Sequence, residues 1–172
     1  MNKTILFGGS GFFGSAILKK NPEIISAGRS KPPEYIVNDY INFESLDNLK
    51  FLDDIDFNKV IFLIGSSNHH EMNNTVTMGI DFNVFPLKKV LAYLSKRKIK
   101  KFICFTTVLL YDEKKMTLPV SEVQEINPYI NEYIFSKYLS EEIVKYFSSK
   151  VPSTIVRLSN IYGYTKLIRP DL

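Results

Sequence analysis

The stretch from Lys3 to Gly14 constrains the fold of this chain more than any other part of its 172 residues. An apolar run, typical of a strand buried on both faces, is followed by Gly8, Gly11 and Gly14 at three-residue spacing. The residues after them, Ser15 to Lys20, favour a helix. Glycines allow close approach to a ligand, and a helix N-terminus offers free N–H groups. This order predicts a pyrophosphate site of a dinucleotide; an ordinary tight turn is the alternative.

The rest of the chain alternates predicted strands with predicted helices. We expect strands at 5–7, 23–27, 35–37, 59–64, 101–106 and 154–158, and helices at 15–20, 45–52, 75–98 and 128–149, with polar or loop segments at 68–77 and 112–127. Pro86 lies inside the third helix and weakens its continuity. The alternation predicts right-handed βαβ units in an α/β fold. We therefore expect a doubly wound parallel sheet of about six strands, the Rossmann fold, with helices on both faces.

Composition excludes little. Lys and Arg number 22 against 18 Asp and Glu, so the net charge is 22 − 18 = +4, too small to imply nucleic acid. The basic run from Lys96 to Lys101 falls at a predicted helix end, where cations complement the dipole. Cys104, the single cysteine, is predicted to be buried in a strand. We expect a cytoplasmic protein without membrane contact, because no apolar run is long enough to cross a bilayer.

Tyr133 and Lys137 form a second candidate site. Residues four apart lie on the same face of a helix. A tyrosine titrates near ~10, and a nearby ammonium lowers that pKa. Such a pair can move a proton to or from a carbonyl or alcohol while hydride moves to or from nicotinamide. Thr107, at the end of a predicted strand, can hydrogen-bond the same oxygen. A surface Tyr–Lys pair is the alternative.

The chain resembles the extended short-chain dehydrogenase/reductase family of the NAD-dependent epimerase/dehydratase type. The resemblance lies in the glycine motif from Gly8 to Gly14, in Asn83-Val84, in the strand that ends before Tyr111, in Tyr133-x-x-x-Lys137 with Ser136 and Glu141, and in Arg157-Leu158-Ser159-Asn160-Ile161-Tyr162-Gly163. These matches occur in the family's order over nearly the whole chain. They imply an enzyme that acts on a nucleotide-activated sugar.

The resemblance assigns roles residue by residue. It implies Thr107, Tyr133 and Lys137 as catalytic residues, and Thr107 and Asn160 as substrate-binding residues. We expect no metal, because the adjacent side chains of His69-His70-Glu71 diverge and the sequence offers no second ligand cluster. The implied cofactor-binding residues are Gly8, Ser10, Gly11, Phe12, Phe13, Gly14, Arg29, Ser30, Asp39, Tyr40, Ile64, Gly65, Ser66, Asn83, Thr106, Tyr133, Lys137 and Leu158. Val108 and Leu109 stand where the family's dehydratases carry Asp-Glu, so sugar dehydration is disfavoured.

Two positions bear on the cofactor. The second predicted strand ends in Gly28-Arg29-Ser30, without the Asp that holds an adenosine 2′-hydroxyl in NAD-selective members. Because an arginine can accommodate a 2′-phosphate, we expect NADP in preference to NAD. The alternative is that Arg29 stacks beside adenine or points to solvent. Asp39 resembles the family's adenine-contacting Asp, and a simple turn residue is the alternative.

We therefore predict an NAD(P)-dependent 4-keto reductase or 4-epimerase of nucleotide-sugars, active as a homodimer through its two long helices. The alternative is a non-catalytic NAD(P)-binding module with a regulatory or redox-sensing role. We expect residues 1–163 to form the NAD(P)-binding domain and 164–172 to begin a C-terminal substrate-binding lobe that is missing here.

Overall fold

Six strands form one parallel sheet in the computed structural model, which describes residues 3–32, 39–75 and 77–163. They are β1 (Lys3–Phe7), β2 (Ile25–Gly28), β3 (Tyr40–Asn42), β4 (Phe57–Phe62), β5 (Lys101–Thr107) and β6 (Ser153–Leu158). Their order across the sheet is β3-β2-β1-β4-β5-β6, and all neighbours are parallel. The chain thus begins at the centre, builds one half, returns and builds the other. This confirms the predicted doubly wound fold.

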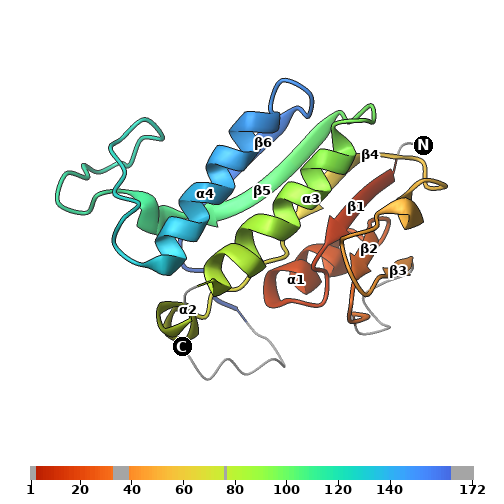
Figure 1. Cartoon of the computed structure of the whole chain (residues 1–172), viewed down its shortest axis with the longest axis horizontal. Coiled ribbons are helices and arrows are strands. Elements are labelled where there is room, and N and C mark those ends of the chain that lie inside the picture. The colour runs from red at the N-terminus through yellow and green to blue at the C-terminus, as the bar shows by residue number, and fades with distance from the viewer. Residues whose placement is uncertain (1–2, 33–38, 76, 164–172) are drawn as a thin grey trace.

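Helices cover both faces of the sheet, as predicted. They are α1 (Phe12–Lys20), α2 (His69–Asn74), α3 (Phe85–Leu94) and α4 (Glu132–Phe147), together with a π-helical turn, η2 (Ile80–Val84), and two 3-10 turns, η1 (Lys50–Leu52) and η3 (Val108–Leu110). The helices α3 and α4 lie side by side across one face (Figure 1). No helix in the described ranges has the length and apolarity needed to span a membrane.

The alternation of side chains along β1 divides the core. Ile5 and Phe7 belong to the large cluster that includes Leu87 and Leu91 of α3. Leu6, between them, packs with Leu18 of α1 on the opposite face. Because successive strand residues point to opposite faces, an unbroken apolar strand requires a helix on each side. The sequence pattern of β1 therefore dictates the three-layer arrangement.

The predicted helix over 75–98 is wrong in its extent. A separate α2 precedes it, and the long helix itself is split into η2 and α3. Asn68 starts α2, because its side-chain oxygen accepts from the Glu71 N–H and its amide donates to the Glu71 carboxylate. Pro86 lies in the first turn of α3. Proline cannot donate to the carbonyl four residues earlier, and the wider π turn ends just before it.

Two further boundaries differ from the predictions. The predicted helix over 45–52 is reduced to η1, because the Ser45 hydroxyl and Asn48 side chain accept from nearby backbone N–H groups. Such bonds compete with a helix. The predicted helix over 128–149 begins only at Glu132, after Asn131 caps it by accepting from Ile134 N–H. The predicted strand 35–37 lies outside the described residues, and the strand that pairs with β2 is β3.

Candidate active site

The glycine turn between β1 and α1 is shaped by three glycines that packing requires. Gly8 has φ +89°, in the left-handed region. A Cβ on Gly14 would lie 2.3 Å from the Gly8 carbonyl oxygen, and one on Gly9 would lie 2.2 Å from Ser26 Oγ. Larger residues at these positions would push α1 away from the sheet. Gly9 was missed as a packing residue because no spacing rule singles it out.

Gly11 differs from these three. It caps α1 without a side-chain hydrogen bond, and the atom nearest to an added Cβ is the Gly8 carbonyl oxygen, at 3.5 Å. The protein's own packing therefore leaves room for a larger side chain at this position. The first turn of α1 also carries no acidic residue. Backbone N–H groups at such a helix start suit an anion, and this loop fits the pyrophosphate of a dinucleotide.

Aromatic side chains flank this turn. The Phe13 ring meets Phe105 of β5 edge-on, with ring centres 5.2 Å apart. A Cβ on Gly163 would lie 3.7 Å from the Phe12 ring, so the segment after β6 passes close to the start of α1. Ser10 is half-buried in the turn. The structure thus brings the predicted glycine-loop residues to the end of the sheet where the parallel strands finish.

Arg29 and Ser30 lie at the same end, exposed after β2. The Tyr40 hydroxyl donates to the Gly28 carbonyl oxygen at 2.7 Å, which ties β3 to this strand end. Burial raises the Tyr40 pKa above its ordinary value of 10.0. A basic side chain beside the glycine turn is compatible with an anionic ligand.

Asp39 lies apart from the other predicted cofactor-binding residues. Asp39 precedes β3, whereas the prediction placed it after the third strand. Its carboxylate forms an exposed ion pair with Lys3, the first residue of β1, at 3.2 Å. Parallel strands begin at one edge and end at the other, so Asp39 lies at the edge opposite the glycine turn. Asn42, the last residue of β3, occupies the edge where an adenine contact was expected.

The end of β4 is held by Asn83 of η2. The Ser66 N–H donates to Asn83 Oδ1 at 2.8 Å, and the Asn83 amide donates to Ser136 Oγ of α4 at 2.9 Å. A Cβ on Gly65 would lie 2.6 Å from Asn83 Oδ1. Ile64, Gly65 and Ser66 are partly or fully accessible. Asn83 is buried with both ends of its amide engaged, so it shapes this loop from within.

Thr106 and Thr107 end β5 in different environments. The Thr106 hydroxyl donates to Glu141 of α4 at 2.8 Å, in a buried position. Thr107 Oγ1 accepts from Leu109 N–H at 3.2 Å and caps η3. Val108 and Leu109 form that turn, so no carboxylate follows Thr107 there. The structure brings Thr107 to the predicted strand end.

Tyr133 and Lys137 lie on α4, one turn apart. The Lys137 Nζ atom is 5.7 Å from the centre of the Tyr133 ring. A Cβ added to Gly65 would lie 3.5 Å from the same Nζ atom. Burial lowers the Lys137 pKa below its ordinary value of 10.5. No hydrogen bond or ion pair joins Lys137 to another residue of the described part. Tyr133 itself is buried. An ammonium beside the β4 end can donate hydrogen bonds to the ribose hydroxyls of a nicotinamide nucleotide.

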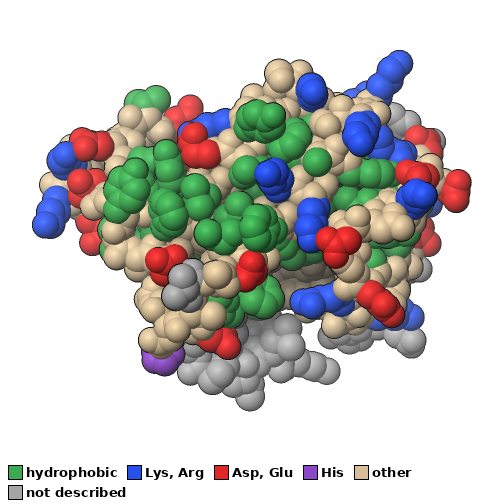
Figure 2. Space-filling model, viewed as in Figure 1, with side chains coloured by type: hydrophobic (Ala, Val, Ile, Leu, Met, Phe, Trp, Pro, Cys, Tyr) green, Lys and Arg blue, Asp and Glu red, His purple; other side chains and the backbone are tan. Residues whose placement is uncertain are grey.

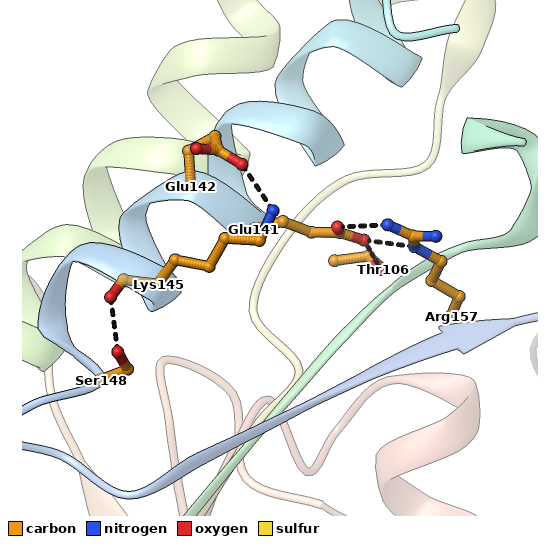
Figure 3. Close-up of polar contacts among 6 residues, drawn as sticks. All are labelled: Thr106, Glu141, Glu142, Lys145, Ser148 and Arg157. Carbon is orange, nitrogen blue, oxygen red and sulfur yellow. Dashed lines mark hydrogen bonds and ion pairs between the residues drawn. The ribbon is translucent and has the colours of Figure 1, made fainter. Parts of the chain in front are cut away.

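The segment after β6 completes the site. Leu158 ends the strand, and Asn160 follows it on the surface. Arg157 binds Glu141 through two hydrogen bonds of 2.8 Å (Figure 3). The Arg157 guanidinium also stacks 4.7 Å from the centre of the Tyr111 ring. The bond to Glu141 raises the Arg157 pKa. This buried pair was missed as a unit. Its signal is Glu141 itself, an acid one turn after Lys137 on the buried stripe of α4.

The six-strand parallel sheet with helices on both faces defines an α/β protein of the Rossmann type. A family model for the NAD dependent epimerase/dehydratase family matches residues 4–171, and the chain belongs to that family. No curated protein matches the sequence.

Solved structures show the same fold. A UDP-glucose 4-epimerase is 21% identical, with a TM-score of 0.82, over 95% of this chain and 53% of that protein. The UDP-N-acetylglucosamine 4-epimerase of Methanobrevibacter ruminantium M1, solved with UDP-N-acetylmuramic acid, is 20% identical, with a TM-score of 0.80, over 94% and 56%. WbmH of Bordetella bronchiseptica, solved with NAD+, is 19% identical, with a TM-score of 0.77, over 99% and 60%. The chain thus spans little more than half the length of these proteins.

Proposed function

We propose that this chain is the cofactor-binding and catalytic part of an NAD(P)-dependent oxidoreductase or epimerase that acts on a nucleotide-activated sugar. A 4-keto reductase or a 4-epimerase is the activity we favour. The single observation that carries this proposal is the Lys137 ammonium, which lies 5.7 Å from the centre of the Tyr133 ring and has no ion-pair partner among the described residues. Both residues lie on α4, which packs against β5. The glycine turn supports it by offering a cradle for the pyrophosphate.

Each residue then has a chemical task. A bound nicotinamide dinucleotide supplies the hydride acceptor or donor. Tyr133 takes a proton from the sugar hydroxyl, or returns one to the carbonyl oxygen. The Lys137 ammonium stabilises the negative charge of the tyrosinate, and it would also donate hydrogen bonds to the ribose of the bound nucleotide. The Thr107 hydroxyl donates a hydrogen bond to the reacting oxygen, and Asn160 contacts the substrate.

The names of the similar structures support this substrate class. They include epimerases of UDP-glucose and UDP-N-acetylglucosamine, and a protein solved with UDP-glucuronic acid and NAD. Several of the similar proteins were solved with NAD, whereas the charge of Arg29 favours NADP. We do not propose a dehydratase activity, because neither Val108 nor Leu109 can protonate a leaving hydroxyl.

We also propose that two copies pair through α3 and α4. Hydrophobic side chains gather over these helices on one face (Figure 2). The exposed members on or next to the two helices are Phe82, Phe85, Tyr129, Ile130 and Tyr146. An apolar patch of this kind favours burial against a partner, and a second copy presents the same patch.

The test begins with fluorescence titration of the protein with NADH and NADPH, on wild type and Arg29→Ala. We expect binding of both, with NADPH preferred and the preference lost in the variant. The protein is then incubated with NADPH and a panel of 4-keto nucleotide-sugars, and with NAD and UDP-hexoses. Absence of NADPH oxidation and of epimer formation, despite cofactor binding, would contradict the catalytic proposal.

A non-catalytic NAD(P)-binding module is the second candidate. Tyr133→Phe separates the two. The variant should bind NADH as wild type does. An enzyme loses turnover in it by about 10²-fold or more, whereas the biological activity of a module is unchanged.

A further inference from the structure

The three elements that carry the proposed catalytic and substrate residues are joined by one buried polar cluster. Thr106 of β5 precedes Thr107, Glu141 of α4 follows Lys137 by one turn, and Arg157 of β6 lies three residues before Asn160. Glu141 Oε1 accepts from both the Thr106 hydroxyl and Arg157 Nε, each at 2.8 Å, and Oε2 accepts from Arg157 Nη2 at 2.8 Å. Figure 3 shows Glu141 pointing from α4 toward both strands.

The cluster is buried, so its hydrogen-bond geometry must be closely satisfied. Glu141 is 1% exposed, Thr106 is 5% exposed, and the Arg157 side chain is 17% exposed. A buried carboxylate is tolerated only when it is paired and its lone pairs are satisfied. A bidentate arginine fixes both distance and angle between the two elements, because its donors form a rigid fork. The cluster therefore permits little change in the position of α4 relative to β5 and β6.

The neighbouring acid on α4 is a useful contrast. Glu142 bonds Lys145 on its own helix at 2.7 Å, and both side chains are about half exposed (Figure 3). That pair joins no second element. An exposed pair of this kind contributes little to stability.

We propose that Glu141 is a positioning residue of the active site, which holds Thr106 and Arg157 so that Tyr133 and Lys137 keep their place opposite Thr107 and Asn160. This inference rests on the proposed function. It also reassigns Thr106, whose hydroxyl acts through Glu141 and not on the cofactor directly. Arg157 continues the cluster to Tyr111 by stacking on its ring.

The experiment uses variants that change hydrogen bonds and keep volume. Thr106→Val removes one hydroxyl from a strand, and Glu141→Gln removes the charge. Thr154→Val on β6 and Glu142→Gln on α4 are the matched controls. Two quantities are measured well below the melting temperature: the dissociation constant for NADH, and amide hydrogen exchange of residues 105–111 and 133–141, with 12–20 as reference.

We expect Thr106→Val and Glu141→Gln each to raise the NADH dissociation constant about tenfold. In the double variant, the dissociation constant should rise no further than in the more affected single variant. Exchange should accelerate in the two site segments and not in α1. Thr106→Ser should restore both quantities, and the controls should match wild type. If the cluster served stability alone, the variants would lower the melting temperature but leave the NADH dissociation constant of the folded protein unchanged.

The contrary results are distinct. The inference is overturned if exchange in the two segments is unchanged in Thr106→Val, if Thr154→Val produces the same changes, or if the two losses multiply in the double variant. If wild type binds neither NADH nor NADPH, the proposed function fails, and the exchange data alone decide whether Glu141 fixes the geometry.

Discussion

The ammonium of Lys137 lies 5.7 Å from the centre of the Tyr133 ring, and no carboxylate in the described part of the chain pairs with it. A desolvated charge without a partner costs stability, which an enzyme accepts when the charge serves binding or catalysis. Burial lowers the Lys137 pKa below 10.5. We therefore infer that the Lys137 ammonium is kept for function, although its desolvation lowers the stability of the protein.

Lys137→Met should raise the free energy of unfolding at neutral pH and abolish dinucleotide binding. The folded protein has the lower lysine pKa, so between that pKa and 10.5 the unfolded state holds more protons and wild type gains stability as pH rises. The advantage of the variant should therefore be largest at neutral pH and shrink toward pH 10.5. Urea unfolding across this pH range measures it. Lys88→Met, at an exposed position on α3, is the control. A variant less stable than wild type at neutral pH would contradict the prediction.

Gly11 and Gly14 should respond differently to the same added methyl group. Gly14→Ala places a Cβ 2.3 Å from the Gly8 carbonyl oxygen and should destabilise the protein by about 2–3 kcal/mol. Gly11→Ala meets no protein atom closer than 3.5 Å and should keep wild-type stability. It should nevertheless weaken NADH binding by about tenfold or more, because its methyl group faces the cradle. Thermal melts and NADH titration of both variants separate the two effects. If Gly11→Ala bound NADH with wild-type affinity, the proposal that the pyrophosphate binds at this turn would be contradicted.

The sheet could be predicted from the sequence because buried strands leave a strong signal. The runs around Ile5, Val60 and Phe102 are apolar on both faces, and only a parallel sheet covered by helices accommodates several such runs. Helix boundaries were harder to predict. Asn68 and Asn131 end loops by capping helices, and Pro86 splits a continuous apolar pattern. These are local hydrogen-bond effects that periodicity does not record.

The site was predicted unevenly for a similar reason. Residues in dense motifs, such as Gly8 and Lys137, lie at the expected edge of the sheet. Asp39 lies at the opposite edge, because assigning it depended on the position of a three-residue strand. Glu141 and Arg157 were visible as motif matches, but their pairing crosses from α4 to β6 and has no counterpart in sequence spacing.

The face formed by α3 and α4 should mediate dimer formation. Tyr146 on α4 is 78% exposed, and Phe85 on α3 is 48% exposed. Substitution of both by glutamate should convert a dimer to a monomer, because charges in an apolar interface remain unpaired. Light scattering after gel filtration measures the mass. Val123→Glu is the control, since Val123 is 87% exposed on the loop before α4. A wild-type monomer at micromolar concentration, or a dimer that survives the double substitution, would contradict the proposed interface.

The Asn83 side chain should stabilise the segment that follows β4. Asn83→Leu keeps the volume but leaves the Ser66 N–H without its acceptor and removes the bond to Ser136 Oγ. We expect a loss of about 2–3 kcal/mol in the free energy of unfolding, because a buried donor loses its partner. Asn73→Leu, at an exposed position on α2, is the control and should change stability little. Because the Gly65–Ser66 segment adjoins Lys137, the Asn83 variant should also bind NADH more weakly under conditions where it is fully folded. Urea denaturation and NADH titration test both effects, and unchanged stability in Asn83→Leu would show that this amide does not hold the loop.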